Sequence, residues 1–164
     1  MEIYIKRTED KDYEFLKKWF EEPENNRLFT SEFRNINEYK KMFLLMALSK
    51  KENIYYTVFS KTERPIGFVA LINTDYIDRS GQIWYVMGDK NYRGKGLMTL
   101  AVELFLEIVK DELGLHTVYT WIVEDNLRSI KVLEKNGFSQ MGIQKHSFFD
   151  GEKFKDKIWL DKIL

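Results

Sequence analysis

The chain reads DKNYRGKGLMT from Asp89 to Thr99, where a predicted strand gives way to a predicted helix. The strand is expected over Gln82–Met87, which is rich in β-branched and aromatic residues and lies between two glycines. The helix is expected to begin at Leu97 and to end near Gly114, a residue suited to a C-terminal cap. Its apolar positions at helical spacing are Leu97, Ala101, Leu104 and Ile108.

This junction has the chemistry of an anion site. A helix N-terminus offers unpaired backbone N–H groups and a partial positive charge. Gly94 and Gly96 allow an anion to approach the backbone closely, and Arg93 and Lys95 add positive charge. The stretch is therefore predicted to bind phosphate.

Two well-known phosphate loops do not fit. A Walker A loop needs four residues between its glycines and then Gly-Lys-Ser/Thr, whereas Gly94 and Gly96 are one residue apart and Leu97 follows. A dinucleotide-binding fingerprint needs a third glycine where this chain has Thr99. If the loop is considered by itself, an ordinary glycine turn before a helix is an alternative interpretation.

A second segment, which reads EDNLRSIKVLEKNGF from Glu124 to Phe138, narrows the choice. Asp125 or Asn126 can cap a helix there, and Gly137 can end it. The segment closely resembles the Asn-x-x-Ser/Ala-x-x-x-hydrophobic-Glu-Lys-x-Gly-Phe pattern of the GNAT acetyltransferases. It is most similar to the RimJ/RimL-like branch of ribosomal-protein N-terminal acetyltransferases.

The first stretch resembles the pyrophosphate loop of the same superfamily, which is usually written Gln/Arg-x-x-Gly-x-Gly/Ala. Asn91 takes the Gln/Arg position and is the one departure. The resemblance is specific over residues 81–138. It implies an α/β (mixed α+β) sandwich of GNAT fold in a single domain, residues 1–164. In that fold a central, mostly antiparallel twisted sheet is flanked by helices and splays between its fourth and fifth strands.

The pattern along the chain agrees with that order of elements. A final hairpin is expected around Asp150-Gly151, a strong hairpin signal. The predicted elements are strand 3–6, helix 10–20, a helix capped by Asn37, strands 55–60, 66–72 and 82–87, the helix from Leu97, strand 117–123, the helix from Asn126, and strands 138–149 and 152–160.

Composition excludes several other classes. With 26 basic and 26 acidic residues, no overall field favours nucleic acid. The absence of cysteine removes disulfides and a cysteine nucleophile, and the two histidines lack the spacing of a zinc site, so no metal is expected. No apolar run approaches the roughly 20 residues of a membrane span, and no signal peptide pattern precedes the first strand. A cytoplasmic monomer or homodimer without membrane or nucleic-acid partners is expected.

The resemblance implies direct transfer of acetyl from acetyl-CoA to a primary amine in a ternary complex. A backbone N–H near Val86 or Met87 would stabilise negative charge on the carbonyl oxygen. Gly88 fits either a bulge, which the family carries in this strand, or a close backbone approach. The residues expected to contact the cofactor are Val86, Met87, Gly88, Tyr92, Arg93, Gly94, Lys95, Gly96, Leu97, Met98, Asn126 and Ser129. Asn126 and Ser129 can instead be ordinary residues of a helix start. Arg128, Lys131 and Lys135 can reach phosphates or form a solvated face.

The general acid and base stay open. The position of the tyrosine that assists thiolate departure in many GNAT enzymes is Leu133 here, so Ser129, which the resemblance places near the sulfur, is the candidate acid. The position of a glutamate common early on the strand is Gln82. The remaining candidate bases are Tyr85, Glu124 and His146, directly or through water. Each also has a structural alternative.

The acceptor site is expected to be shaped by the first two helices with their loop, residues 23–34, and by the final hairpin. Glu32 and Asp156 are candidates to attract a cationic amine. Phe29, Phe33, Phe148 and Phe149 either wall the pocket or complete the core. The pattern does not separate a protein N-terminus from an amino sugar, an antibiotic or a polyamine. The alternative function is a non-catalytic acyl-CoA-binding sensor or interaction module, which Leu133 and Gln82 favour.

Overall fold

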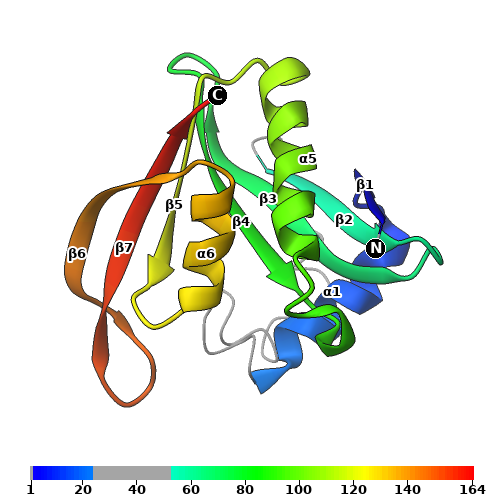
Figure 1. Cartoon of the computed structure of the whole chain (residues 1–164), viewed down its shortest axis with the longest axis horizontal. Helices are drawn as coiled ribbons and strands as arrows, with labels where there is room; N and C mark the ends of the chain where they lie inside the picture. The colour runs from blue at the N-terminus through cyan, green and yellow to red at the C-terminus, as the bar shows by residue number, and fades with distance from the viewer. Residues whose placement is uncertain (1, 24–52) are drawn as a thin grey trace.

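The computed structural model describes residues 2–23 and 53–164, and Figure 1 shows how their elements are arranged. The predicted helix capped by Asn37 and the predicted loop of residues 23–34 lie outside the described residues, apart from Pro23. In chain order the elements are β1 (Ile3–Arg7), a 3-10 turn η1 (Asp10–Asp12), α1 (Tyr13–Glu21), β2 (Ile54–Ser60), β3 (Pro65–Asp75), β4 (Ser80–Met87), a 3-10 turn η2 (Lys90–Tyr92), α5 (Leu97–Asp111), β5 (Thr117–Val123), α6 (Leu127–Lys135), β6 (Ser139–Phe149) and β7 (Phe154–Ile163).

The described strands form one sheet in the order β1-β2-β3-β4-β5-β7-β6. Neighbouring strands are antiparallel except β4 and β5, which run parallel. These two strands pair only where Ser80–Gln82 meets Thr117–Tyr119. Beyond that point they diverge, as Figure 1 shows. The predicted mostly antiparallel sheet with a splay between its fourth and fifth strands is confirmed.

Strand alternation places a hydrophobic cluster on each face of the sheet. Val69 and Leu71 of β3 point to the face that α5 covers, whereas Phe68 and Ala70 point to the face that α1 covers. Leu16 and Trp19 of α1 pack in this second cluster. β2 and the Ile66–Leu71 part of β3 are buried on both faces, and their sequences are nearly continuous apolar runs rather than an alternation.

Helix α5 lies along the sheet with a broad buried stripe. The stripe comprises Leu97, Met98, Ala101, Val102, Phe105, Leu106 and Val109. Leu104 and Ile108, which spacing placed on the buried face, are only half-buried, so the stripe is rotated from the prediction. Helix α6 packs beside α5 and buries Leu133 completely. The starts of both helices lie near the end of β4 (Figure 1).

Candidate acyl-CoA site

The loop after β4 is anchored firmly at its start. The Asp89 carboxylate accepts a hydrogen bond from the Asn91 N–H (3.0 Å) and forms an ion pair with Arg64 (2.8 Å). The Asp89 N–H donates to the Ile66 carbonyl (2.9 Å). The Asp89 side chain is only 9% exposed. These contacts fix the loop to the neighbouring end of the β2–β3 hairpin.

The glycine part of the loop is open on one side. Gly94 (φ +73°) and Gly96 (φ +76°) adopt left-handed backbone conformations, which glycine accepts without steric cost. A Cβ added at either position would meet nothing within 4 Å, so the protein leaves space there. Gly96 is the N-cap of α5, and the first-turn N–H groups of Leu97 and Met98 have no partners within the helix. The geometry fits an anion on these groups.

Arg93 faces the protein rather than the open side of the loop. Its Nε donates to the Met87 carbonyl (3.2 Å), and its guanidinium lies 4.0 Å from a carboxylate oxygen of Glu22. Its side chain is 19% exposed. Lys95, in contrast, is exposed, with its Nζ 5.6 Å from the centre of the Tyr92 ring. Arg93 therefore fastens the loop to β4 and to the residue after α1, and Lys95 is the cation that the loop presents.

The end of β4 is shaped by two close approaches. A Cβ at Gly67 of β3 would lie 2.4 Å from the Val86 carbonyl oxygen, and a Cβ at Gly88 would lie 2.0 Å from the Trp19 indole. The β3–β4 register is regular from Gly67 to Ile72 and shifts only beyond it. The implied bulge beside Gly88 is absent from this ladder. At Gly88 the structure shows the Trp19 side chain packed directly on the glycine backbone.

The start of α6 lies across the splay from β4. The Asn126 side chain caps α6 by accepting from the Ser129 N–H (3.3 Å). The Tyr85 hydroxyl donates to the Ser129 carbonyl (2.9 Å). Both side chains of the predicted helix start, Asn126 and Ser129, are half-buried. The structure thus brings Tyr85, Asn126 and Ser129 together beside the splayed end of β4.

Glu124 extends the β5–β7 ladder by one step. Its N–H donates to the Asp156 carbonyl, and its carboxylate accepts from the Asp156 N–H, both at 3.1 Å. The Asp156 carboxylate in turn accepts from the His146 N–H (2.8 Å). His146 has φ +50° and lies in an irregular stretch of β6, where the register shifts between Gln144 and Phe148. All three predicted residues therefore have backbone contacts that shape the hairpin.

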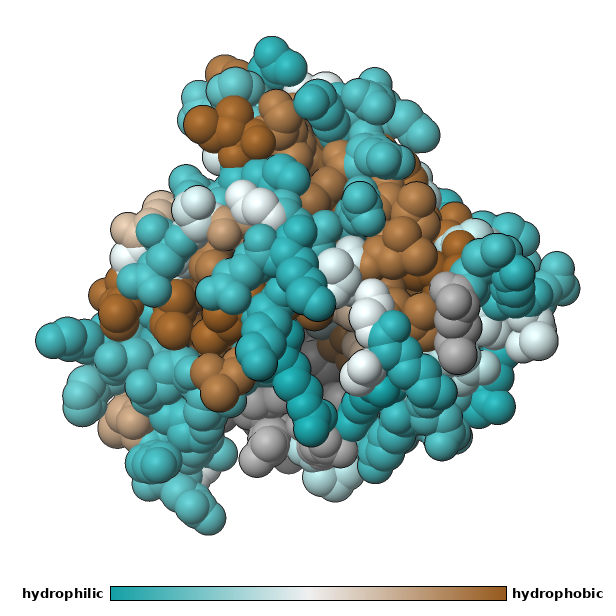
Figure 2. Space-filling model, in the orientation of Figure 1, coloured by the Kyte–Doolittle hydropathy of each residue, from teal (hydrophilic) through white to brown (hydrophobic). Residues whose placement is uncertain are grey.

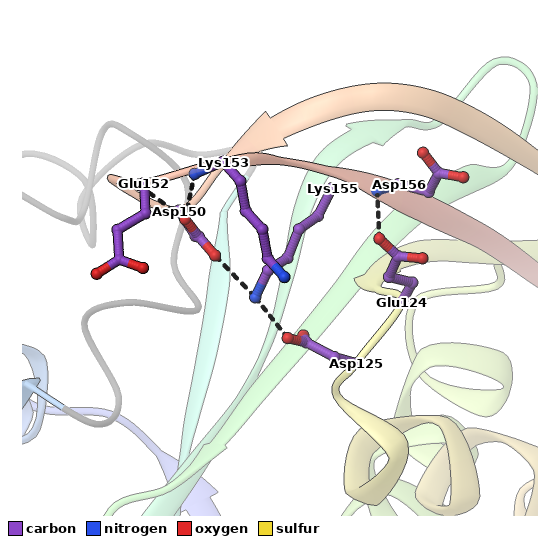
Figure 3. A network of polar contacts seen from close by, with 7 residues as sticks. All are labelled: Glu124, Asp125, Asp150, Glu152, Lys153, Lys155 and Asp156. Atoms are coloured by element: carbon purple, nitrogen blue, oxygen red, sulfur yellow. Dashed lines mark hydrogen bonds and ion pairs between the residues drawn. The ribbon is translucent and has the colours of Figure 1, made fainter.

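Next to Glu124 and Asp156, the Lys155 side chain forms ion pairs with two aspartates (Figure 3). Its ammonium contacts the carboxylates of Asp125, just before α6, and of Asp150 (2.8 Å), in the hairpin turn. Asp150 also accepts from the N–H groups of Glu152 and Lys153, each at 2.9 Å. These contacts lower the pKa of Asp150, with the Lys155 hydrogen bond as the largest cause, and raise that of Lys155. The tip of the β6–β7 hairpin is thereby tethered to the start of α6.

Comparison with known proteins identifies the family. Residues 2–139 match the sequence profile described as acetyltransferase (GNAT) domain. The chain belongs to this GNAT family. A relative, the probable N-acetyltransferase YjcK of Bacillus subtilis, is 34% identical over 116 residues, or 68% of this chain and 60% of that protein. The spermidine N(1)-acetyltransferase of Escherichia coli strain K12 is 28% identical over 92 residues, or 56% of this chain and 49% of that protein.

The match thus spans about half to three-fifths of the length of these curated relatives. Among solved structures, the spermidine N-acetyltransferase of Vibrio cholerae in complex with CoA and spermine superposes with a TM-score of 0.84. The superposition covers 98% of this chain and 95% of that one, at 19% identity. This likeness confirms the GNAT fold.

The candidate catalytic residues differ in their burial and in their hydrogen-bond partners. Ser129 lies beside the splayed end of β4, and its carbonyl accepts the Tyr85 hydroxyl. Burial raises the pKa of Tyr85 well above its usual range, so this phenol stays protonated and acts as a donor. Glu124 is exposed, and one of its carboxylate oxygens is occupied by the hairpin. Leu133, in the position of the familiar tyrosine acid, is fully buried.

Other predicted contact residues have mixed outcomes. Phe148 is buried and lies against Trp121, so it completes the core, whereas Phe149 is exposed and packs on Phe154. Glu32, Phe29 and Phe33 lie outside the described residues. Hydrophilic side chains run down the middle of the face that carries α6 and the start of α5 (Figure 2). The exposed basic residues of α6 are Arg128, Lys131 and Lys135.

Several residues of the site escape sequence reasoning. The buried Asn136 side chain donates to the Thr99 carbonyl (3.1 Å), which ties the end of α6 to the first turn of α5. Its Asn-Gly context signalled only a helix end. The contacts of Glu22, Trp19 and Gly67 join segments far apart in the chain, so no local motif could have shown them.

Residues 2–23 and 53–164, the part of the chain that the structure describes, contain neither a metal cluster nor a membrane-spanning helix. Within those ranges no three histidine, aspartate or glutamate side chains gather in a way that could hold a metal ion. None of the helices there has the length and apolar character needed to cross a membrane.

Replacing Lys155 with methionine should loosen the tether between the hairpin turn and α6. Two carboxylates would lose their shared cation, and we expect amide exchange in the Asp150–Lys153 turn and at Asn126 to become at least about threefold faster. Because of these two pKa shifts, both partners of the tether are charged at every pH between the usual pKa of aspartate and the usual pKa of lysine. The stabilisation is lost as the pH falls through the lowered pKa of Asp150 or rises through the raised pKa of Lys155. Hydrogen exchange at pH 7 with Lys153→Met as the matched control measures the effect. Equal exchange in both variants would contradict it.

Proposed function

We propose that this chain is an acetyl-CoA-dependent N-acetyltransferase that acetylates a primary amine of a small molecule. The observation that carries the proposal is the open glycine loop at the start of α5, directly after the splayed end of β4. Family membership supports it, because GNAT acetyltransferases use acetyl-CoA as the acetyl donor. The residues present fit the cofactor, since the left-handed glycines leave unfilled space beside a helix N-terminus.

In this reaction the amine nitrogen bonds to the acetyl carbon, the C–S bond of the thioester breaks, the amine loses a proton, and the departing thiolate gains one. The chain would contribute binding at the loop from Tyr92 to Met98 and orientation along Val86, Met87 and Gly88. Asn126 would fix the start of α6, and the Ser129 hydroxyl would supply the proton to sulfur. The candidate proton acceptors for the amine are Glu124 and His146, each acting through water, because Tyr85 is held protonated.

For the acceptor we propose a polyamine as the first candidate class. Relatives over about half of this chain are named spermidine N(1)-acetyltransferases. The hairpin and the neighbouring turn also carry two exposed acidic side chains, Glu124 and Glu152, next to the Asp150–Lys155 ion pair (Figure 3). An amino sugar or a protein N-terminus is the other option, the latter fitting the RimJ/RimL-like branch. That branch, a cytoplasmic location and a monomeric or homodimeric state stay predictions from the sequence.

The second candidate is an acyl-CoA-binding module without turnover. Leu133 favours it, because a fully buried leucine replaces the familiar tyrosine acid. Gln82 favours it as well, because its side-chain oxygen accepts from Asn73 (3.1 Å) where a glutamate could have served as the base. Proximity and backbone donors can still support catalysis without these groups.

Calorimetry with acetyl-CoA followed by a thiol-release assay separates the candidates. We expect binding in the micromolar range, as is common for enzyme substrates, and thiol release with spermidine but less with glucosamine or with a peptide N-terminus. Binding without release for any amine would favour the sensor. Failure of the folded protein to bind acetyl-CoA would contradict both candidates.

A further inference from the structure

The polar contact between Tyr85 and α6 spans the opening in the sheet. Tyr85 lies on the α5-facing side of β4, three residues beyond the last β4–β5 pair at Gln82. Its hydroxyl donates to the Ser129 carbonyl at 2.9 Å, across 44 positions of sequence. This hydrogen bond connects β4 to the first turn of α6 at a point where β4 and β5 are no longer paired.

Ser129 is held from two directions at once. Its N–H donates to the Asn126 side chain (3.3 Å) and main chain (3.1 Å), which fixes it within α6. Its carbonyl receives the Tyr85 hydroxyl, which fixes it relative to β4. A carbonyl oxygen has two lone pairs, so it can accept this bond as well as the usual bond inside the helix. The Ser129 hydroxyl is left out of both contacts.

We propose that Tyr85 is a positioning residue whose hydroxyl sets the separation between β4 and the start of α6, and with it the place of Ser129. This inference rests on the proposed acetyl transfer, because the gap it sets is the one that receives the thioester. Tyr85 acts through α6 and takes no proton from the amine. The proposal therefore excludes Tyr85 as the general base, a role for which the sequence made it a candidate.

Tyr85→Phe tests the proposal because it removes the hydroxyl and keeps the ring in the core. We expect kcat to fall about three- to tenfold, the range for one lost hydrogen bond. The KM for acetyl-CoA should change little, and both limbs of the pH profile of kcat/KM should stay where they are. Amide exchange at the start of α6 should become faster. Tyr56→Phe is the matched control, a half-buried tyrosine of β2 packed against the same cluster.

The outcomes separate the possible failures. Loss of one limb of the pH profile, or a fall in kcat of more than about a thousandfold, would assign Tyr85 the base role and overturn the proposal. Unchanged kcat together with unchanged exchange at α6 would also overturn it. If the wild type acetylates no amine, the proposed function fails, and exchange at the start of α6 in Tyr85→Phe still decides whether the hydroxyl holds this helix.

Discussion

Replacing Gly94 with glutamate should weaken acetyl-CoA binding at least about 100-fold, which corresponds to about 2.7 kcal/mol. The new carboxylate would project into the open side of the loop, since a Cβ there meets nothing within 4 Å. It would place a negative charge at the N-terminus of α5, where it satisfies the same N–H groups that a phosphate needs. It would also repel the phosphate. Calorimetric titration with acetyl-CoA measures the loss.

Gly114→Glu is a close control for this substitution. Gly114 follows α5 at its other end, also has a left-handed conformation (φ +66°), and also faces open space. Both variants therefore carry a similar backbone strain, on the order of 1 kcal/mol, and the same change of net charge. Only the variant at the N-terminal end should lose binding. If both variants bind acetyl-CoA like the wild type, the cofactor does not use this loop.

Local pattern was enough to predict most of the described elements. Strands and helices were recognised where periodicity and caps coincide, as in α6, which begins after Asn126 and ends before Gly137 with φ +78°. The buried face of α5 is broader than the four apolar positions of the predicted stripe, so its orientation differs from the prediction. β3 extends to Asp75, beyond its predicted end at Ile72, through a register shift that no residue pattern marks.

In the candidate site, too, the local features could be predicted from the sequence and the contacts between distant segments could not. The glycines of the loop and the Asn126 cap are local features, so the sequence could indicate them and the geometry agrees. The role of Arg93 could not be foreseen, because its contacts are the Met87 carbonyl and Glu22, which come from other elements. The contact of Tyr85 with Ser129 depends on how far the sheet opens, which is set by tertiary packing.

Gly67→Ala should be the most damaging small substitution in the sheet, with a fall in kcat/KM of about 100-fold. Gly67 needs no unusual backbone angle. Its constraint is the neighbouring strand, because an added Cβ would lie 2.4 Å from the Val86 carbonyl oxygen and 3.3 Å from the Met87 Cα. Backbone atoms cannot turn aside as a side chain can, so β4 must shift. Val86 and Met87 are the residues proposed to orient the acyl group, and their displacement acts directly on the reaction.

The same substitution should lower the free energy of unfolding by about 1–3 kcal/mol, as is usual for overpacking. A shift of β4 and simple unfolding are told apart by measuring kcat/KM well below the melting temperature of the variant. Gly142→Ala in β6 is the matched control, because a Cβ there meets nothing within 4 Å and its backbone is not left-handed. That variant should keep its activity and change stability by no more than about 0.5 kcal/mol. A fully active Gly67→Ala enzyme would mean that the position of the Val86 carbonyl is not important for acetyl transfer.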